Sequence, residues 1–400
     1  MADPSFLLDS QVPSPCFVID LDRLRQNARV LAGVQERTGA RIFLALKGYA
    51  CPSTFPLLSR ALGRGGPLYG TCASSVDEAR LGREEFGGKV EAFAAAWSED
   101  EMRELVTLAD TIVFNSVAQW HRFRDIVKAA PRSIECGLRI NPEHSEGTVP
   151  IYDPCSPISR LGIRRRDLPG GIMSEGFSGL HFHTLCEQGA DALARTVEAV
   201  EKNFAPFLEQ CSWINCGGGH HITRDGYDID LLVDVLNHLH DTYHAQIYLE
   251  PGEAVALNAG WLTATVLDIT EADMPLVQLD VSAACHMPDV LEMPYRPGLL
   301  YECCGGLRQA GEAGTGKWTC RLGGKSCLAG DVIGVYSFDE PLRIGQRVIF
   351  QDMAIYSMVK TTTFNGLRLP SIATAEDRPG GTDFSLLRTF GYNDFRERLD

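Results

Sequence analysis

The chain lacks the features of a membrane-spanning, exported or nucleic-acid-binding protein. No apolar run approaches the roughly 18 residues that a membrane-spanning helix needs. The first residues have no basic segment followed by an apolar core, as a secretory signal would have. There are 37 Lys and Arg against 52 Asp and Glu, a formal net charge of −15, which disfavours binding to a phosphate backbone. We therefore expect a cytoplasmic protein with no membrane or nucleic-acid partner.

Paired cysteine motifs and a dinucleotide-binding fingerprint are missing as well. The 13 cysteines are scattered, with one adjacent pair and no CxxC spacing. They predict reduced thiols and argue against a disulfide framework or a zinc site. No GxGxxG turn is present, which disfavours a doubly wound dinucleotide-binding domain.

Short apolar segments alternate with amphipathic segments from about residue 20 to residue 250. The segments that predict strands are 42–46, 68–71, 90–94, 111–114, 136–140, 179–183, 212–215 and 246–249. The segments that predict helices are 21–37, 54–62, 75–85, 99–108, 117–129, 190–208 and 228–243. Eight strands that alternate with helices predict a (β/α)8 TIM barrel over residues 20–255.

Two of these helices carry clear local signals. Ser98 precedes three acidic residues, as a helix N-cap does. In 190–208 the apolar side chains recur at helical spacing; they are Leu193, Val197, Val200, Phe204, Phe207 and Leu208. We therefore expect one helix to begin after Ser98 and the other to bury its apolar face.

Beyond residue 255 the pattern changes to strands joined by Gly- and Pro-containing turns. The predicted strands are 255–269, 276–281, 298–304, 318–322, 331–335, 347–351 and 354–364. They predict a C-terminal β-barrel or β-sandwich domain over residues 256–400. The apolar stretch 16–19 precedes the barrel pattern, so we expect residues 1–19 to join this domain.

Reactive side chains stand where the predicted barrel strands end. They are Lys47 after the first strand, Arg139 near the end of the fifth, His181 and His183 in the sixth, Gly217, Gly218 and Gly219 after the seventh, and Glu250 after the eighth. Barrel enzymes collect their chemistry at the carboxyl ends of their strands. The coincidence therefore predicts an active site at that end.

These residue types suit an aldehyde cofactor that carries a phosphate. A lysine amine forms a Schiff base with an aldehyde, glycine N–H groups cup a phosphate, and a carboxylate keeps a pyridine nitrogen protonated. Ordinary explanations stay open: Lys47 could reach solvent past a strand end, the glycines could form a flexible turn, and His183 could be a core histidine. The HxH spacing of His181 and His183 is also that of a metal site, although no bridging carboxylate is evident.

The predicted β domain adds a cysteine and a cluster of acids. Cys327 lies between two glycine turns, where it is either a small hydrophobe or, beside an aldehyde cofactor, a proton donor to a carbanion. Segment 280–297 is too rich in proline and acid for a strand, so we expect a structured loop. Its carboxylates are either solvated or directed at an ammonium group.

Taken together, these residues resemble those of the fold type III pyridoxal phosphate (PLP) enzymes, the group of alanine racemase and of the ornithine and diaminopimelate decarboxylases. Within that group the chain is most similar to the carboxynorspermidine/carboxyspermidine decarboxylase family. The resemblance runs from Ser14 to Gly366. The segments that carry it are LHFHTLCE (180–187), GGGHHIT (217–223), EPGEA (250–254) and CHMPDVLEMPY (285–295).

The resemblance implies a pyridoxal 5'-phosphate site in which Lys47 carries the cofactor, His183 stacks on its ring and Glu250 faces the pyridine nitrogen. The other residues implied for the cofactor are Arg139, Gly217, Gly218, Gly219 and Tyr356. Cys327 would reach into the site of the other subunit, so a homodimer with shared active sites is expected.

The resemblance also implies a cationic substrate. Relatives that act on ornithine or diaminopimelate usually read EPGR where this chain reads EPGE. Glu253 in place of that arginine repels a distal carboxylate and suits a distal amine. The expected reaction is decarboxylation of carboxynorspermidine or carboxyspermidine to norspermidine or spermidine. The expected substrate contacts are Glu253, Asp289, Glu292 and Arg296.

Other functions stay open at this point. PLP-dependent decarboxylation of another basic amino acid, such as diaminopimelate or ornithine, and racemisation would use the same cofactor. A PLP-binding protein without turnover is a third possibility, although such proteins are generally single barrels. Metal-dependent hydrolysis through His181 and His183 is a fourth.

Overall fold

The computed structural model describes residues 2–147, 149–168, 170, 173 and 175–400. It divides into two units. The first, Arg25–Val255, is called the barrel unit below, and the second, Met1–Leu24 with Ala256–Asp400, is called the β unit. The N-terminal strand β1 (Cys16–Asp20) pairs with strands of the β unit on both sides.

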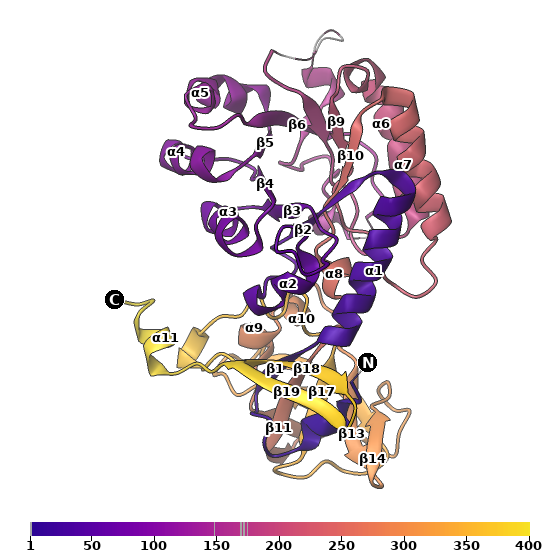
Figure 1. The fold of residues 1–400 in the computed structure, drawn as a ribbon. Helices are drawn as coiled ribbons and strands as arrows, with labels where there is room; N and C mark the ends of the chain where they lie inside the picture. Colours follow the sequence, from indigo (N-terminus) through magenta and orange to yellow (C-terminus); the bar gives the residue numbers. More distant parts are fainter. Residues whose placement is uncertain (1, 148, 169, 171–172, 174) are drawn as a thin grey trace. The chain divides into compact units, whose positions relative to one another are not determined.

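Parallel strands of the barrel unit close on themselves (Figure 1). They are β2 (Arg41–Ala45), β3 (Gly70–Ala73), β4 (Lys89–Phe93), β5 (Thr111–Phe114), β6 (Glu135–Asn141), β8 (Gly179–His181), β9 (Trp213–Asn215) and β10 (Gln246–Leu249). Within the described residues this unit has a nine-stranded sheet in the order β5-β4-β3-β2-β10-β9-β8-β6-β7, and β5 also pairs with β6. All of these strands except β7 (Ile163–Arg164) therefore form a barrel of eight, which confirms the predicted (β/α)8 fold.

Helices surround these strands (Figure 1). They are α1 (Leu21–Thr38), α2 (Phe55–Leu58), α3 (Val76–Leu81), α4 (Glu99–Leu108), α5 (Val117–Lys128), α6 (Ala190–Leu208), α7 (Ile229–Tyr243) and the short α8 (Glu253–Ala256). The helix predicted over 54–62 is only four residues long, because the chain leaves it at Ser59, which forms an isolated bridge with Leu68. The helix predicted over 75–85 changes after Leu81 into a π-helical turn over Gly82–Phe86.

The two strongest local signals are confirmed. The Ser98 side chain accepts the Glu101 N–H at 3.2 Å, and the Glu101 carboxylate accepts the Ser98 N–H at 2.8 Å, a complete capping box for α4. All six apolar residues predicted to face the core from α6 are buried.

A tryptophan fills the barrel interior where two glycines leave space for it. Trp213 on β9 packs in a buried cluster with Phe43, Val113 and Tyr248, which come from three other strands. A Cβ built on Gly137 or on Gly179 would lie 2.1 Å from the Trp213 ring. Only glycine fits at these positions of β6 and β8, because the Trp213 ring lies against their backbone; isolated strand glycines often mark such close contacts.

The β unit is a mixed, curled sheet. Its strands after β1 are β11 (Gly260–Glu271), β12 (Pro275–Leu279), β13 (Leu299–Cys303), β14 (Gly306–Gln309), β15 (Trp318–Gly323), β16 (Val332–Phe338), β17 (Arg347–Gln351), β18 (Ser371–Arg378) and β19 (Gly381–Arg388). The main path runs β14-β13-β17-β11-β1-β18-β19, with β12, β15 and β16 attached through β11.

Three details of the β unit differ from the prediction. Residues 354–364, predicted as a strand, form a run of turns followed by the 3-10 helix Phe364–Gly366. The strand predicted from residue 255 begins at Gly260, after α8. Strands β14, β18 and β19 were not predicted. Polar side chains hide the two-residue alternation in β14 and β19, which lie at the two ends of the main path, and in β18 three successive residues are buried.

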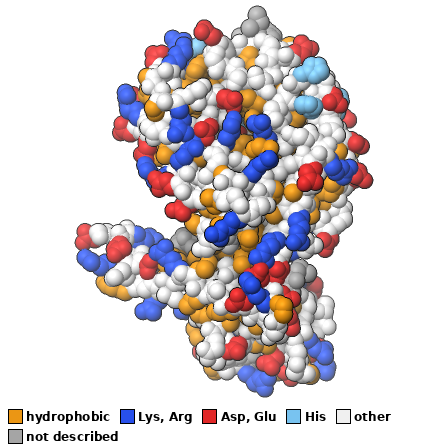
Figure 2. Space-filling view, viewed as in Figure 1, with side chains coloured by type: hydrophobic (Ala, Val, Ile, Leu, Met, Phe, Trp, Pro, Cys, Tyr) orange, Lys and Arg blue, Asp and Glu red, His pale blue; other side chains and the backbone are white. Residues whose placement is uncertain are grey.

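The segment 280–297, predicted as a structured loop, contains two single-turn helices, α9 (Ala283–His286) and α10 (Asp289–Glu292). The last helix of the chain is α11 (Tyr392–Arg396), which follows β19. On the face in view, acidic and basic side chains of the barrel unit are interspersed (Figure 2). No helix within the described residues combines the length and the apolar character that crossing a lipid bilayer would need.

Candidate active site

The barrel unit has a pocket at the carboxyl ends of its strands. Its lining residues are Ala45, Lys47, Cys72, Ser74, Phe93, Arg139, His181, His183 and Glu250. Five of the residues that the sequence singles out therefore lie around one pocket, although they come from four different strands or the turns that follow them.

Lys47 stands on a tight turn directly after β2. The Gly48 N–H donates to the Ala45 carbonyl at 3.0 Å, which turns the chain and leaves the Lys47 side chain exposed. A Cβ on Gly48 would lie 2.8 Å from the Gly252 Cα, so this turn is packed against the turn that follows Glu250. The close backbone approach holds the lysine and the carboxylate at the same pocket.

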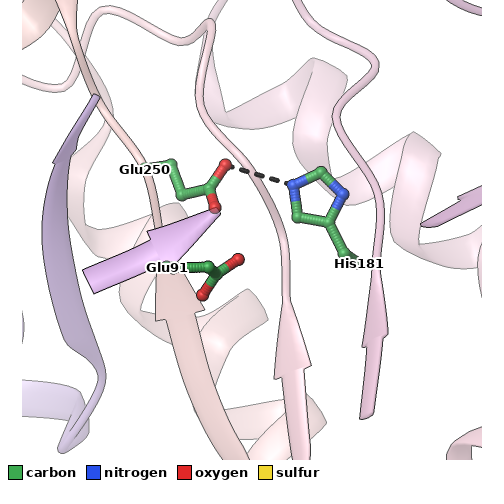
Figure 3. A group of neighbouring side chains, drawn as sticks. All are labelled: Glu91, His181 and Glu250. Atoms are coloured by element: carbon green, nitrogen blue, oxygen red, sulfur yellow. Dashed lines mark hydrogen bonds and ion pairs between the residues drawn. The ribbon is translucent and has the colours of Figure 1, made fainter. Parts of the chain in front are cut away.

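Glu250 belongs to a buried polar network that crosses the barrel interior (Figure 3). His181 Nε2 lies 3.1 Å from Glu250 Oε2. Asn215 Nδ2 donates to Glu250 Oε1 at 2.8 Å and to Glu91 Oε1 at 2.7 Å. Glu91 on β4 is fully buried, and its neighbours Val90 and Ala92 pack in the cluster under the helices, so the alternation of the strand turns Glu91 inward.

The two carboxyl groups of this network cannot both carry a charge without cost. Their oxygen atoms and the His181 nitrogen lie within 4.8 Å of one another. Two like charges at that distance repel by roughly 3 kcal/mol or more at an effective dielectric constant of about 20. Burial, followed by the nearby Glu250 carboxylate, raises the pKa of Glu91 well above its ordinary value. Burial also acts to raise the pKa of Glu250, but His181 and Glu91 outweigh it and hold that pKa well below its ordinary value.

The same three side chains are close enough to surround a metal ion. However, the lone pairs of Glu250 already accept hydrogen bonds from His181 and Asn215. His183, the other half of the HxH motif, lies outside this group and has a different partner. The arrangement is accounted for by hydrogen bonds within the protein.

His183 is held as a neutral imidazole. The Gly218 N–H donates to His183 Nδ1 at 3.0 Å, so this nitrogen carries a lone pair. Burial, with Lys47 and Arg139 next in importance, lowers the pKa of His183 well below its ordinary value. Both observations place the ring proton on Nε2.

Arg139 brings a buried cation to the pocket. Its side chain is 4% exposed, and burial lowers its pKa to about 10. It donates to the His183 carbonyl at 2.9 Å and stacks on Phe93, with the guanidinium carbon 4.5 Å from the ring centroid. The pocket lining contains two cationic side chains, Arg139 and Lys47, and one carboxylate, Glu250. The pocket therefore suits an anionic ligand.

The glycine turn after β9 is built from positions where a side chain does not fit. Gly217 and Gly219 have positive φ values of +69° and +85°, and a Cβ on Gly218 would lie 2.2 Å from the Glu250 carbonyl oxygen. The N–H groups of Gly217 and Gly218 already donate to Asn215 and His183. The Gly219 N–H has no hydrogen-bond partner within the described residues, and it is the donor of this turn that an anion would meet.

Replacing Gly219 by alanine is expected to destabilise the protein strongly. Gly226→Ala is the matched control, because Gly226 has a similar φ of +77° but open space around it. The control should cost about 1–2 kcal/mol for backbone strain, whereas the Gly219→Ala Cβ would also lie 1.9 Å from the Leu185 carbonyl oxygen and should add about 1–3 kcal/mol. Urea unfolding of the two apoproteins measures the difference; equal losses would contradict the packing argument.

Glu253 lies beside His221, a residue that follows the glycine turn. Its Oε2 atom is 3.1 Å from His221 Nε2, but the angle does not make a hydrogen bond. The neighbouring His220 contacts the Tyr227 hydroxyl at 2.6 Å. The Glu253 carboxylate is partly exposed, so it keeps oxygen atoms for a further cationic partner.

The remaining candidate residues belong to the β unit. Lys360 Nζ contacts both acids of α10, Asp289 at 2.5 Å and Glu292 at a shorter distance. Arg296 pairs with Glu312 and stacks on Tyr336, with its guanidinium carbon 4.6 Å from the ring centroid.

Two further candidates of the β unit lie in turns. Cys327 is exposed, and its N–H donates to the Asn365 side chain at 3.0 Å. Tyr356 lies in the run of turns after β17 with a positive φ of +39°.

Two site residues were missed from the sequence, namely Glu91 and Asn215. A glutamate inside the apolar segment 90–94 is unusual, because carboxylates are rarely buried without a partner. That signal could have identified Glu91. Asn215 directly precedes the glycine turn, but nothing in its local sequence indicates that it joins two carboxyl groups.

Comparison with known proteins gives matches along the whole chain. Residues 19–218 match the family described as alanine racemase, N-terminal domain. A carboxyaminopropylagmatine decarboxylase from Synechocystis sp. is 44% identical, over 98% of this chain and 96% of the relative. A carboxynorspermidine/carboxyspermidine decarboxylase from Campylobacter jejuni is 38% identical, over 97% of this chain and 99% of the relative.

Solved structures agree with the fold. The crystal structure of carboxynorspermidine decarboxylase complexed with norspermidine, from Campylobacter jejuni, has a TM-score of 0.83 at 36% identity, covering 96% of this chain and 99% of that chain. Diaminopimelate decarboxylase from Helicobacter pylori, complexed with L-lysine, has a TM-score of 0.77 at 15% identity, covering 97% of each chain, which supports the fold alone. With full-length relatives at this identity and a pocket lined by the expected lysine, histidine and glutamate, the chain belongs to the fold type III family of PLP-dependent decarboxylases.

Proposed function

We propose that this protein is a PLP-dependent decarboxylase of carboxylated polyamines. The observation that carries the proposal is the convergence of Lys47, His183 and an ionised Glu250 on one pocket. These residues fit the cofactor: an amine for its aldehyde, a planar neutral ring for its face, and a carboxylate for its pyridine nitrogen. The buried Arg139 and the unpartnered Gly219 N–H add positive potential for a phosphate.

Bound PLP supplies a sink for the electrons that remain when carbon dioxide leaves the α-carbon. Lys47 would provide the amine that holds the cofactor aldehyde and would give way to the substrate amine. Glu250 would keep a proton at the pyridine nitrogen, and Asn215 and His181 hold its two oxygens in place. His183, neutral and fixed by Gly218, would cover the ring without adding a charge.

Reprotonation of the α-carbon would fall to a thiol. We assign this role to Cys327 of the partner subunit in a homodimer, because an exposed thiol on a turn can deliver its proton to a neighbouring site. Tyr356 would contribute to the phosphate site in the same assembly.

Acidic side chains would select a polycationic substrate. The Glu253 carboxylate is partly exposed, and Asp289 and Glu292 hold the Lys360 ammonium between them, which supports an affinity of these acids for an amine. Arg296 would lie near the carboxylate of the substrate or the cofactor.

The finer choice of substrate has two candidates. Carboxynorspermidine or carboxyspermidine is favoured by the family resemblance and by the Campylobacter jejuni relative. Carboxyaminopropylagmatine is favoured by the 44% identity to the Synechocystis relative, and its planar guanidinium would suit paired carboxylates.

The proposed function is tested by carbon dioxide release from the PLP-loaded protein. The panel comprises carboxynorspermidine, carboxyspermidine, carboxyaminopropylagmatine, diaminopimelate, ornithine and arginine. We expect the highest kcat/KM among the three carboxylated polyamines. Preference for diaminopimelate or ornithine, or loss of optical rotation without carbon dioxide release, would overturn the proposal.

Glu253→Gln should separate substrate binding from chemistry. Loss of the charge should raise KM about tenfold and change kcat much less, because the carboxylate would bind ground state and transition state equally. Glu36→Gln, on the exposed face of α1, is the matched control. An unchanged KM, or a parallel fall in kcat, would contradict the role assigned to Glu253.

A further inference from the structure

Glu91 is a fully buried carboxyl group that does not reach the pocket. It lies on β4 with 0% exposure and is absent from the pocket lining, whereas Glu250 forms part of that lining. Figure 3 shows the Glu91 carboxyl below that of Glu250. A buried carboxyl at such a position needs an explanation, because it neither meets solvent nor lines the pocket.

The hydrogen bonds around the two carboxyl groups are unequal. Glu250 accepts from His181 through one oxygen and from Asn215 through the other. Glu91 accepts only from Asn215, and its Oε2 atom has no hydrogen-bond partner among the described residues. A carboxylate is stabilised by each donor that it accepts. The charge therefore belongs on Glu250, and a proton belongs on the unpartnered oxygen of Glu91.

Asn215 holds the two carboxyl groups in the arrangement that puts the charge on Glu250 and the proton on Glu91. Its amide nitrogen donates one hydrogen to each carboxyl group, and its amide oxygen accepts the Gly217 N–H at 2.8 Å. Both N–H groups of the amide are thus used and its oxygen is bonded to the glycine turn, so Asn215 cannot turn to favour the other acid without breaking that bond.

We propose that Glu91 is a positioning residue that keeps its proton and so holds Glu250 as the ionised carboxylate of the pocket. The inference rests on the proposed function, in which Glu250 faces the pyridine nitrogen. A protonated Glu91 supports the Glu250 carboxylate without competing for its charge. An ionised Glu91 would repel it and draw the proton onto Glu250, which would then be unable to keep the pyridine nitrogen protonated.

The surroundings of Glu91 agree with this division of charge. The titratable groups that face it are Glu250 after β10, His181 on β8, Cys72 on β3, Tyr248 on β10 and Glu135 on β6. Burial is the largest cause that raises the pKa of Glu91, and the charge of Glu250 adds to it. Burial is also the largest cause that lowers the pKa of His181, and the hydrogen-bond partner of this imidazole is Glu250, not Glu91.

The protonation state of Glu91 can be measured directly in the apoprotein. Infrared difference spectra between wild type and Glu91→Gln at neutral pH should show the loss of a protonated carboxyl C=O stretch. Glu135→Gln is the matched control: Glu135 is 44% exposed and lies 3.7 Å from Lys89, so its variant should lose a carboxylate stretch instead. Loss of a carboxylate stretch in Glu91→Gln would overturn the proposal.

The effect on the reaction distinguishes a neutral hydrogen-bond partner of Asn215 from a side chain that only fills space. In the PLP-loaded enzyme Glu91→Gln should keep kcat within about threefold of wild type, because its amide is neutral and its oxygen can still accept the hydrogen bond from Asn215. Glu91→Leu should lower kcat roughly tenfold to a hundredfold with little change in KM, since it removes the acceptor of the Asn215 N–H but leaves the pocket lining intact. It should also change the pH dependence of the cofactor absorbance, which Glu91→Gln should not.

Two results of this second experiment would count against the proposal. If Glu91→Gln is as impaired as Glu91→Leu, the charge of Glu91 is required; if both behave as wild type, Glu91 has no role. Should Glu91→Leu fail to fold, the infrared measurement still decides, because it needs neither PLP nor turnover. For the same reason, failure of the protein to bind PLP would overturn the proposed function only. The infrared measurement would still test whether Glu91 carries a proton.

Discussion

Lys47→Ala is expected to abolish both turnover and the visible absorbance of bound PLP. The pocket contains one lysine, on the turn after β2, and covalent attachment of the aldehyde requires its amine. Turnover of the best carboxylated polyamine should fall on the order of a thousandfold or more, because the covalent route is lost and not only weakened.

The point of attachment can be mapped as well. Reduction of the PLP-loaded wild-type protein with borohydride should fix the cofactor on the peptide that contains Lys47, where mass spectrometry detects it. Lys89→Ala, which removes a surface lysine paired with Glu135, should retain activity and labelling. Retained turnover in Lys47→Ala, or a label on another lysine, would refute the assignment of this pocket.

Asn215→Asp is expected to be the most destabilising single substitution in the buried network. The new oxygen would face two carboxyl groups that now receive N–H donors at 2.7 and 2.8 Å. Removing a donor while adding a buried acid should cost about 3 kcal/mol or more. The change can be followed as a shift of the urea midpoint of the apoprotein, so that cofactor binding does not contribute.

The pH dependence of this loss has a definite sign. In the folded protein the pKa of an aspartate at 215 would be raised by burial and by Glu250, so the folded state would bind a proton that the unfolded chain releases. The destabilisation should therefore be smallest in acid and should grow as the pH rises through the unfolded pKa of about 4. Asn203→Asp is the control, because within the described residues the Asn203 side chain donates its hydrogen bond to the Pro142 backbone carbonyl, at 3.0 Å. An equal loss in both variants, or a loss that shrinks towards neutral pH, would contradict the proposed network.

Much of the pocket could be predicted because barrel enzymes place their active sites at the carboxyl ends of their strands. Parallel strands that close into a barrel bring the residues after each strand to one end. Lys47, Arg139, His183 and Glu250 are far apart in the chain, yet their positions relative to the predicted strands were enough to place them together. The predicted strand bounds were within two residues for these strands, since buried apolar runs are unambiguous when helices separate them.

The available backbone donor of the glycine turn could not be predicted from the sequence. The residue types of the turn predict an anion site, and the turn does follow β9 and contact the pocket residue His183 through Gly218. The structure adds that the Gly217 and Gly218 N–H groups are already bonded within the protein. Which backbone donor is available depends on contacts with Asn215 and His183, and these contacts are made only when the strands are assembled.

The sequence by itself determined the barrel, the strand ends that carry reactive groups and the family, because periodicity and local motifs are properties of neighbouring residues. Only the tertiary structure decided that Glu91 and Glu250 face each other and that Asn215 joins them. The charge of a buried carboxyl depends on its distance from other charges and donors. Those distances exist only after β4, β9 and β10 have come together inside the barrel.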